Sequence, residues 1–123
     1  MAQEIDKAIP ILEQVSKMSK DGKSYVLLGN LYLQEDKITQ AIDAIEKGIK
    51  KGGLTNTSQV YMALGQAHFE NQSFEDAKKQ FRVAARSKDE KIKKAANNWL
   101  RYTENEEVRI KNLALRRDFI QNS

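Results

Sequence analysis

The chain has 123 residues, of which 40% are hydrophobic and 31% are charged, with one proline, six glycines and no cysteine. This balance is typical of folded, soluble proteins, and the lack of cysteine excludes disulfides, thiolate metal sites and cysteine nucleophiles. No apolar run approaches the roughly 18 residues of a membrane span, and residues 1–20 carry charges throughout, unlike a signal peptide. The net charge of +4 is uneven: it is −3 over residues 1–77 (8 Lys against 11 Asp and Glu) and +7 over residues 78–123 (13 Lys and Arg against 6 Asp and Glu).

The first element expected along the chain is a helix over residues 3–20. Its apolar residues recur at helical spacing: Ile5, Ala8, Leu12 and Val15. Pro10 lies inside this segment, and because proline removes a backbone hydrogen bond we expect it to kink or delay the helix.

Two pairs of helices are expected next. The first pair covers about 23–35 and 38–50, and the second covers about 58–71 and 74–87, with the short polar breaks EDK and NQS inside the pairs. An offset of 36 residues matches the pairs: Tyr25 with Tyr61, Leu28 with Leu64, Gly29 with Gly65, Tyr32 with His68, Ala41 with Ala77, Ile45 with Phe81, Gly48 with Ala84. The second half of this unit also occurs upstream at an offset of 33, where IDKAIPIL (5–12) aligns with ITQAIDAI (38–45) and, through it, with FEDAKKQF (74–81). Three echoes in one register indicate a repeat protein.

The recurring glycine inside the first helix of each pair has a physical explanation. A glycine in a helix interior costs roughly 1 kcal/mol relative to alanine, so its return at the same place implies a packing requirement. We expect Gly29 and Gly65 to face Ala41 and Ala77, where the two helices of each pair approach closely.

The spacing aromatic-x2-Leu-Gly-x2-aromatic, followed by Ala-x3-large apolar, resembles the tetratricopeptide repeat. The resemblance implies an all-α fold, a solenoid of antiparallel helix pairs with a C-terminal capping helix, in a single domain. Its expected parts are a half repeat at 3–20, repeats at 22–55 and 58–91, and a capping and extension helix at 90–121. The chain departs from the family in having Tyr for the first Trp, no closing proline, and a longer junction, KKGGLTN (50–56).

The last element expected is a helix that begins after Asp89, a plausible N-cap, and runs to about Ile120. One face of it is expected to cover the last repeat, through Ile92, Ala95, Ala96, Trp99, Leu100 and Thr103. Beyond TENEE an apolar set is interleaved with basic residues: Val108, Ile110, Leu113, Ala114, Leu115, Phe119 and Ile120. Two interpretations are open. Either this stripe is an interface that pairs two copies, or the helix bends back after Asn105 or frays.

The residues 3–20 match only the second helix of a repeat, which predicts that the chain is the C-terminal part of a longer repeat protein. The tail NNWLRYTENEEVRIKNLAL is similar to the C-terminal ends of some bacterial periplasmic repeat proteins. The resemblance favours a periplasmic over a cytoplasmic location.

The sequence predicts no enzyme, no cofactor and no metal site. The one histidine, His68, replaces the tyrosine of the packing motif, and partners for catalysis at defined spacing do not accompany it. No Asp-x-Asp-Gly loop, His-Glu-x-x-His motif or glycine loop after a strand occurs.

A basic run raises nucleic-acid binding as an alternative function, because phosphate contacts need little more than such charge. It comprises Lys78, Lys79, Arg82, Arg86, Lys88, Lys91, Lys93 and Lys94. Acidic residues return at Asp89 and Glu90, and a run of charge is usually a solvated helix face.

The resemblance implies that the first helices line a groove for a peptide or partner helix. Carried over by position, the lining residues are Lys23, Val26, Asn30, Leu33, Gln34, Gln59, Met62, Gln66, Phe69 and Glu70. Val26 and Ala63 stand where chaperone-tail binders have a lysine and an asparagine, so a carboxylate clamp is not expected. The sequence therefore predicts a non-catalytic protein-interaction module, with self-association through 108–120 as the alternative. Substituting Leu113 and Ile120 with Glu should give monomers if the alternative holds.

Overall fold

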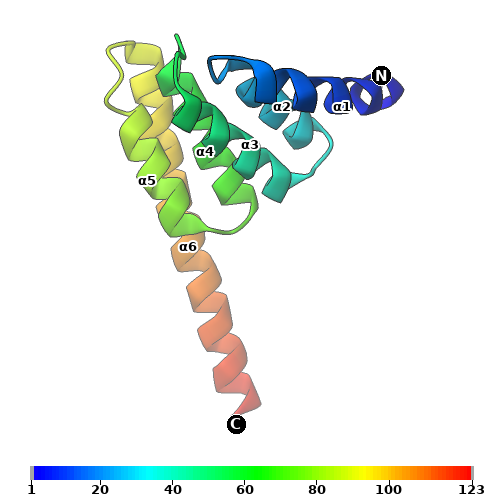
Figure 1. Ribbon diagram of the computed structural model, residues 1–123. Helices are drawn as coiled ribbons and strands as arrows, with labels where there is room; N and C mark the ends of the chain where they lie inside the picture. The colour runs from blue at the N-terminus through cyan, green and yellow to red at the C-terminus, as the bar shows by residue number, and fades with distance from the viewer. Residues whose placement is uncertain (1, 123) are drawn as a thin grey trace.

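The computed structural model describes residues 2–122, with side chains from Glu4 onward, and these residues form six α-helices and no strand. The helices are α1 (Ala2–Met18), α2 (Lys23–Gln34), α3 (Ile38–Lys51), α4 (Thr57–Glu70), α5 (Phe74–Ala84) and α6 (Glu90–Gln121). Helices α2 and α3 pack as one pair and α4 and α5 as another; α1 packs on α2 and α6 on α5 (Figure 1). The predicted all-α helical-repeat solenoid is confirmed.

The close approach predicted at the repeated glycines is present. A Cβ atom on Gly29 would lie 2.5 Å from Ile45 Cγ1 and 3.2 Å from the Ala41 carbonyl oxygen. A Cβ on Gly65 would lie 2.5 Å from Phe81 Cε1, so at this site the limiting neighbour is Phe81 rather than the expected Ala77. Both glycines are therefore required by the distance between paired helices.

The apolar core follows the stack from one helix pair to the next. One cluster, formed by Ile42, Ile45, Val60, Leu64 and Ala67, joins α3 to α4. A second, formed by Ile9, Leu28 and Ala44, joins α1 to α2 and α3. Because each layer buries apolar surface only against its neighbours, the units support one another along the chain.

The turns inside the two pairs are also equivalent. Asp36 and Gln72 lie 36 residues apart, and both adopt left-handed backbone conformations, with φ of 58° and 59°. The longer junction between the pairs uses Gly52 and Gly53, with φ of 80° and 71°, where glycine avoids the steric cost of a Cβ. The Lys51 ammonium ties this junction to α1 by donating to the Ser16 carbonyl oxygen at 2.7 Å.

Two helix ends and one proline inside a helix bear on the sequence predictions. The Asp89 side chain accepts a hydrogen bond from the Lys91 amide at 2.9 Å, which confirms the predicted N-cap of α6. Helix α5 ends at Ala84 rather than near 87, because a tight turn follows in which Arg86 and Ser87 donate to carbonyls three residues back. Pro10 lies on the exposed side of α1, and the helix continues through it.

Helix α6 does not bend back on the repeats. It is one helix of 32 residues, and Figure 1 shows its C-terminal half projecting away from the other helices. None of the described helices has the length and hydrophobicity that a membrane-spanning segment needs.

Candidate protein-interaction surface

Two adjoining hollows lie on the face shared by α2, α4 and α6. The first, of about 360 Å³, is lined by Gln59, Met62, Ala63, Gln66, Lys91, Ile92 and Ala95. The second, of about 460 Å³, is lined by Leu33, Asp36, Ile38, Gln66, Ala67, Glu70 and Trp99. Gln66 borders both hollows, and we call the two together the α4/α6 groove.

The α4/α6 groove contains half of the lining residues expected from the sequence. It brings together Leu33, Gln59, Met62, Gln66 and Glu70. The sequence did not place α6 in this surface, although its residues Lys91, Ile92, Ala95 and Trp99 form one wall. Their spacing of three and four residues identifies one helix face, but not which surface that face helps to line.

The other expected lining residues have different surroundings. Val26 is half-buried and packs against the cluster that joins α3 to α4. Lys23, Asn30 and Gln34 are exposed on α2 and lie outside both hollows. The structure therefore does not bring these three residues together with the rest of the expected lining.

Phe69 is part of an aromatic cluster that holds α6 against the repeats. Its ring lies 5.6 Å from that of Trp99, 5.3 Å from Tyr102 and 5.7 Å from Phe74, measured between ring centroids. Trp99 in turn stacks on Phe81 at 5.6 Å, with 21° between the ring planes. Because these contacts occupy much of the Phe69 ring, the open apolar surface of the groove comes mainly from Met62, Leu33 and Ile92.

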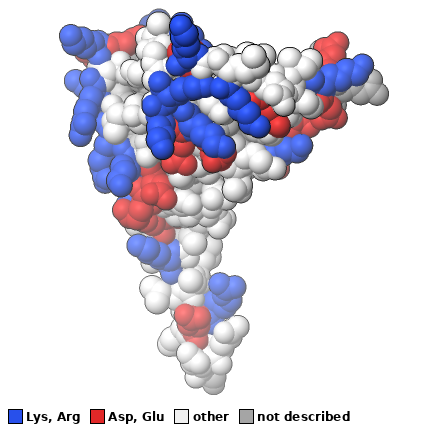
Figure 2. Space-filling view, in the orientation of Figure 1, with Lys and Arg blue, Asp and Glu red and all other residues white. Residues whose placement is uncertain are grey.

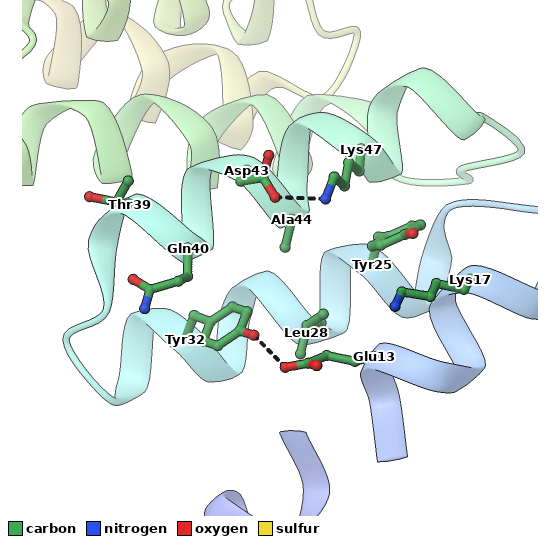
Figure 3. Close-up of a pocket in the computed structure, with 10 residues that line it drawn as sticks. All are labelled: Glu13, Lys17, Tyr25, Leu28, Tyr32, Thr39, Gln40, Asp43, Ala44 and Lys47. Atoms are coloured by element: carbon green, nitrogen blue, oxygen red, sulfur yellow. Dashed lines mark hydrogen bonds and ion pairs between the residues drawn. The ribbon is translucent and has the colours of Figure 1, made fainter. Parts of the chain in front are cut away.

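A third hollow, of about 520 Å³, lies on the opposite side of α2, between α1 and α3 (Figure 3). The Tyr32 hydroxyl donates to Glu13 Oε1 across it at 2.8 Å, and Lys47 pairs with Asp43 at 2.9 Å along its wall. Burial, together with the neighbouring Glu13 carboxylate, raises the pKa of Tyr32 to about 12. The Tyr32–Glu13 hydrogen bond joins α2 to α1, whereas the Lys47–Asp43 pair lies within α3.

The described residues contain no group of three or more His, Cys, Asp or Glu side chains placed to hold a metal ion. His68 is buried in α4, and its Nδ1 atom has no hydrogen-bond partner among the described residues. This burial agrees with the packing role that the sequence predicts for it.

The basic run is partly neutralised in the fold. The Lys78 ammonium is buried, where it pairs with Glu75 at 2.8 Å and with Glu107 at 2.9 Å. Figure 2 shows Lys and Arg along the outer side of α5, with Asp and Glu where α5 meets α6. Binding of nucleic acid here stays a prediction, and steep loss of retention on DNA or RNA with rising salt is the measurement that checks it.

Comparison with known proteins identifies the repeat. Residues 22–50, which cover α2 and all but the last residue of α3, match the sequence profile of the tetratricopeptide repeat. No curated protein matches the chain. The match shows a tetratricopeptide repeat formed by α2 and α3, and the equivalent second helix pair at an offset of 36 residues and the stacked helices agree with a helical-repeat fold.

Proposed function

We propose that the chain is a non-catalytic protein-interaction module that binds a peptide or partner helix in the α4/α6 groove. Tetratricopeptide repeats generally mediate contacts between proteins. The observation that carries the proposal is the hollow between α4 and α6, in which the half-buried Met62 supplies apolar surface.

The lining of the groove favours a ligand with an apolar anchor and free backbone groups. Met62 and Ile92 offer apolar surface on opposite walls, and methionine adapts its shape to different partners. The amides of Gln59 and Gln66 both donate and accept hydrogen bonds, which suits a peptide backbone. Lys91 lies at one end of the groove and Glu70 at the other. These charges favour a ligand with an acidic group near Lys91 and a basic group near Glu70.

The experiment is a selection of random peptides displayed on phage against the immobilised chain. Peptides enriched on the natural chain are expected to lose at least tenfold in affinity for Met62→Glu, because the new carboxylate is placed in the apolar part of the groove. Lys79→Glu, on the exposed side of α5, is the matched control and should bind like the natural chain. If the selected peptides bind Met62→Glu as tightly as they bind the natural chain, the proposal is wrong.

A second candidate function is self-association through the end of α6. The observation that favours it is the exposure of large apolar side chains there: Val108, Leu113, Leu115, Phe119 and Ile120. Exposed apolar stripes of this kind usually mark an interface.

A further inference from the structure

The exposed side of α1 is a second-helix face without a first helix on it. At the internal offset of 33 residues, Ala8, Ile11, Leu12 and Val15 correspond to Ala41, Ala44, Ile45 and Gly48 of α3. Those four α3 residues are buried, and Ala41, Ile45 and Gly48 make the close contacts with α2. On α1, by contrast, Ile11 is 64% exposed, Val15 42% and the adjoining Met18 82%. We call Ala8, Ile11, Val15 and Met18 the α1 face.

The end of α6 resembles a first helix that has no second helix packed on it. Ile110, Leu113, Ala114 and Arg117 follow the spacing of Tyr25, Leu28, Gly29 and Tyr32 at an offset of 85 residues. Leu113 and Ala114 thus stand where the first helices α2 and α4 carry the Leu-Gly pair that packs on their second helices. Leu113 is 49% exposed in the projecting half of α6 (Figure 1). The tail of α6, residues 108–121, therefore has a large and a small apolar residue at the positions of that Leu-Gly pair, and no second helix lies beside them in the described chain.

Within one copy, the α1 face and the tail of α6 do not meet. Helices α1 and α6 do not contact each other in the described chain, and they lie at opposite ends of the helix stack (Figure 1). We propose that the tail of α6 of one copy docks on the α1 face of a second copy and takes the place of a first helix there. This inference rests on self-association, the second candidate function, and is independent of the α4/α6 groove.

Charge and length agree with this docking. Helix α1 carries three acidic residues against two basic ones, a net charge of −1, whereas the tail carries four basic residues against one acidic, a net charge of +3. Opposite charges favour a pairing of α1 with the tail, while two tails side by side would repel. The tail has 14 residues, as many as α4, and at 1.5 Å per residue both are about 21 Å long.

The pairing is head-to-tail, so it differs in kind from a symmetric dimer. Each copy offers one α1 face and one tail, and a heterologous contact of this type produces rings or open chains. The mass of the natural chain should therefore rise with concentration to 28 kDa, which is twice the 14.1 kDa of one copy, or above it.

The test is a mixing experiment with two variants, followed by light scattering. Ile11→Glu removes the α1 face, and Leu113→Glu removes the docking side of the tail. Each variant alone is expected to remain at 14.1 kDa, because its one intact surface finds no partner surface. An equimolar mixture is expected to form a heterodimer of twice that mass, since each variant supplies what the other lacks. Asn112→Glu, exposed on the opposite side of the tail, should assemble like the natural chain.

Three outcomes would overturn the proposal. If Ile11→Glu dimerises alone, Leu113→Glu does not and mixing has no effect, two tails pair symmetrically. If Leu113→Glu dimerises alone, the α1 faces pair with each other. A natural chain that stays at 14.1 kDa at high concentration has no self-association at all. Circular dichroism checks that each variant folds, and Met18→Glu on the same face repeats the test should Ile11→Glu unfold.

Discussion

At the residue scale, Gly65 shows how one missing side chain sets the distance between two helices. Its position faces Phe81, which is fully buried and stacks on Trp99. In Gly65→Ala the new Cβ would lie 2.5 Å from the Phe81 ring, so the ring and the stacked Trp99 have to move. Overpacking of this kind costs about 1–3 kcal/mol and exceeds the gain of about 1 kcal/mol in helix propensity. We expect the free energy of unfolding, measured by urea titration, to fall.

The control for this substitution is Lys79→Ala, at an exposed position of α5 where no packing changes. Its free energy of unfolding should stay within about 0.5 kcal/mol of the natural chain. A Gly65→Ala chain that is as stable as this control would show that the helix pair tolerates a wider spacing.

At the scale of elements, the buried Lys78 ammonium holds α6 against α5. It bonds Glu75 on its own helix and Glu107 on α6. Lys78→Gln removes the charge that both carboxylates share and leaves Glu107 half-buried without its cation, so we expect α6 to loosen. Hydrogen exchange should quicken for the amides of residues 90–107, while Lys79→Gln, one residue away and exposed, should leave them unchanged. Equal exchange in the two variants would contradict a role for this ion pair.

The pH dependence of this contact follows from the two groups. Hydrogen bonds to Glu75 and Glu107 raise the pKa of Lys78, so its contribution is complete below its ordinary value of 10.5 and is lost as pH rises through the raised value. The hydrogen bond from Lys78 lowers the pKa of Glu75, so that contribution is complete above 4.5 and is lost as pH falls through the lowered value. The stability difference between the natural chain and Lys78→Gln should be constant between these values and shrink outside them.

At the scale of the whole molecule, the tail of α6 is separate from the folded repeats. Its side chains are exposed except for Ile110 and Ala114, and the ion pair at Glu107 comes just before it. A chain that ends at Glu107 should unfold within about 0.5 kcal/mol of the full chain, because little packing is removed, and should lose self-association. Urea titration and light scattering measure the two effects; a loss well above 1 kcal/mol would show that the tail packs on the repeats in solution.

Much of the fold was predictable because its causes are local. The 3.6-residue spacing of apolar residues located the helices, the 36-residue offset located the helix pairs, and Asp89 marked where α6 begins. The end of α5 was misplaced because the helical pattern continues through Val83 and Ala84 into a turn, and periodicity alone does not mark the last hydrogen bond.

The candidate site was predictable only in part. Met62, Gln66 and Leu33 were expected from the resemblance to the tetratricopeptide repeat, whose lining positions were carried over onto the first helices. The wall supplied by Ile92 and Trp99 did not follow, since it depends on how α6 crosses α4 and α5. Phe69 was expected as an anchor for a ligand, and its place among Phe74, Trp99 and Tyr102 stems from the same crossing.

The sequence by itself determined that this protein is a stack of paired helices with a glycine where the helices of each pair approach closely. The reason is that the repeat spacing and the size of each side chain are properties of the residues themselves. Only the tertiary structure decided which apolar faces are covered and which stay open. It closed much of the surface around Phe69, left the groove beside Met62 open, and placed the α1 face and the tail of α6 at opposite ends. The physical reason is that exposure depends on the direction in which neighbouring helices run, and α6 runs past the repeats.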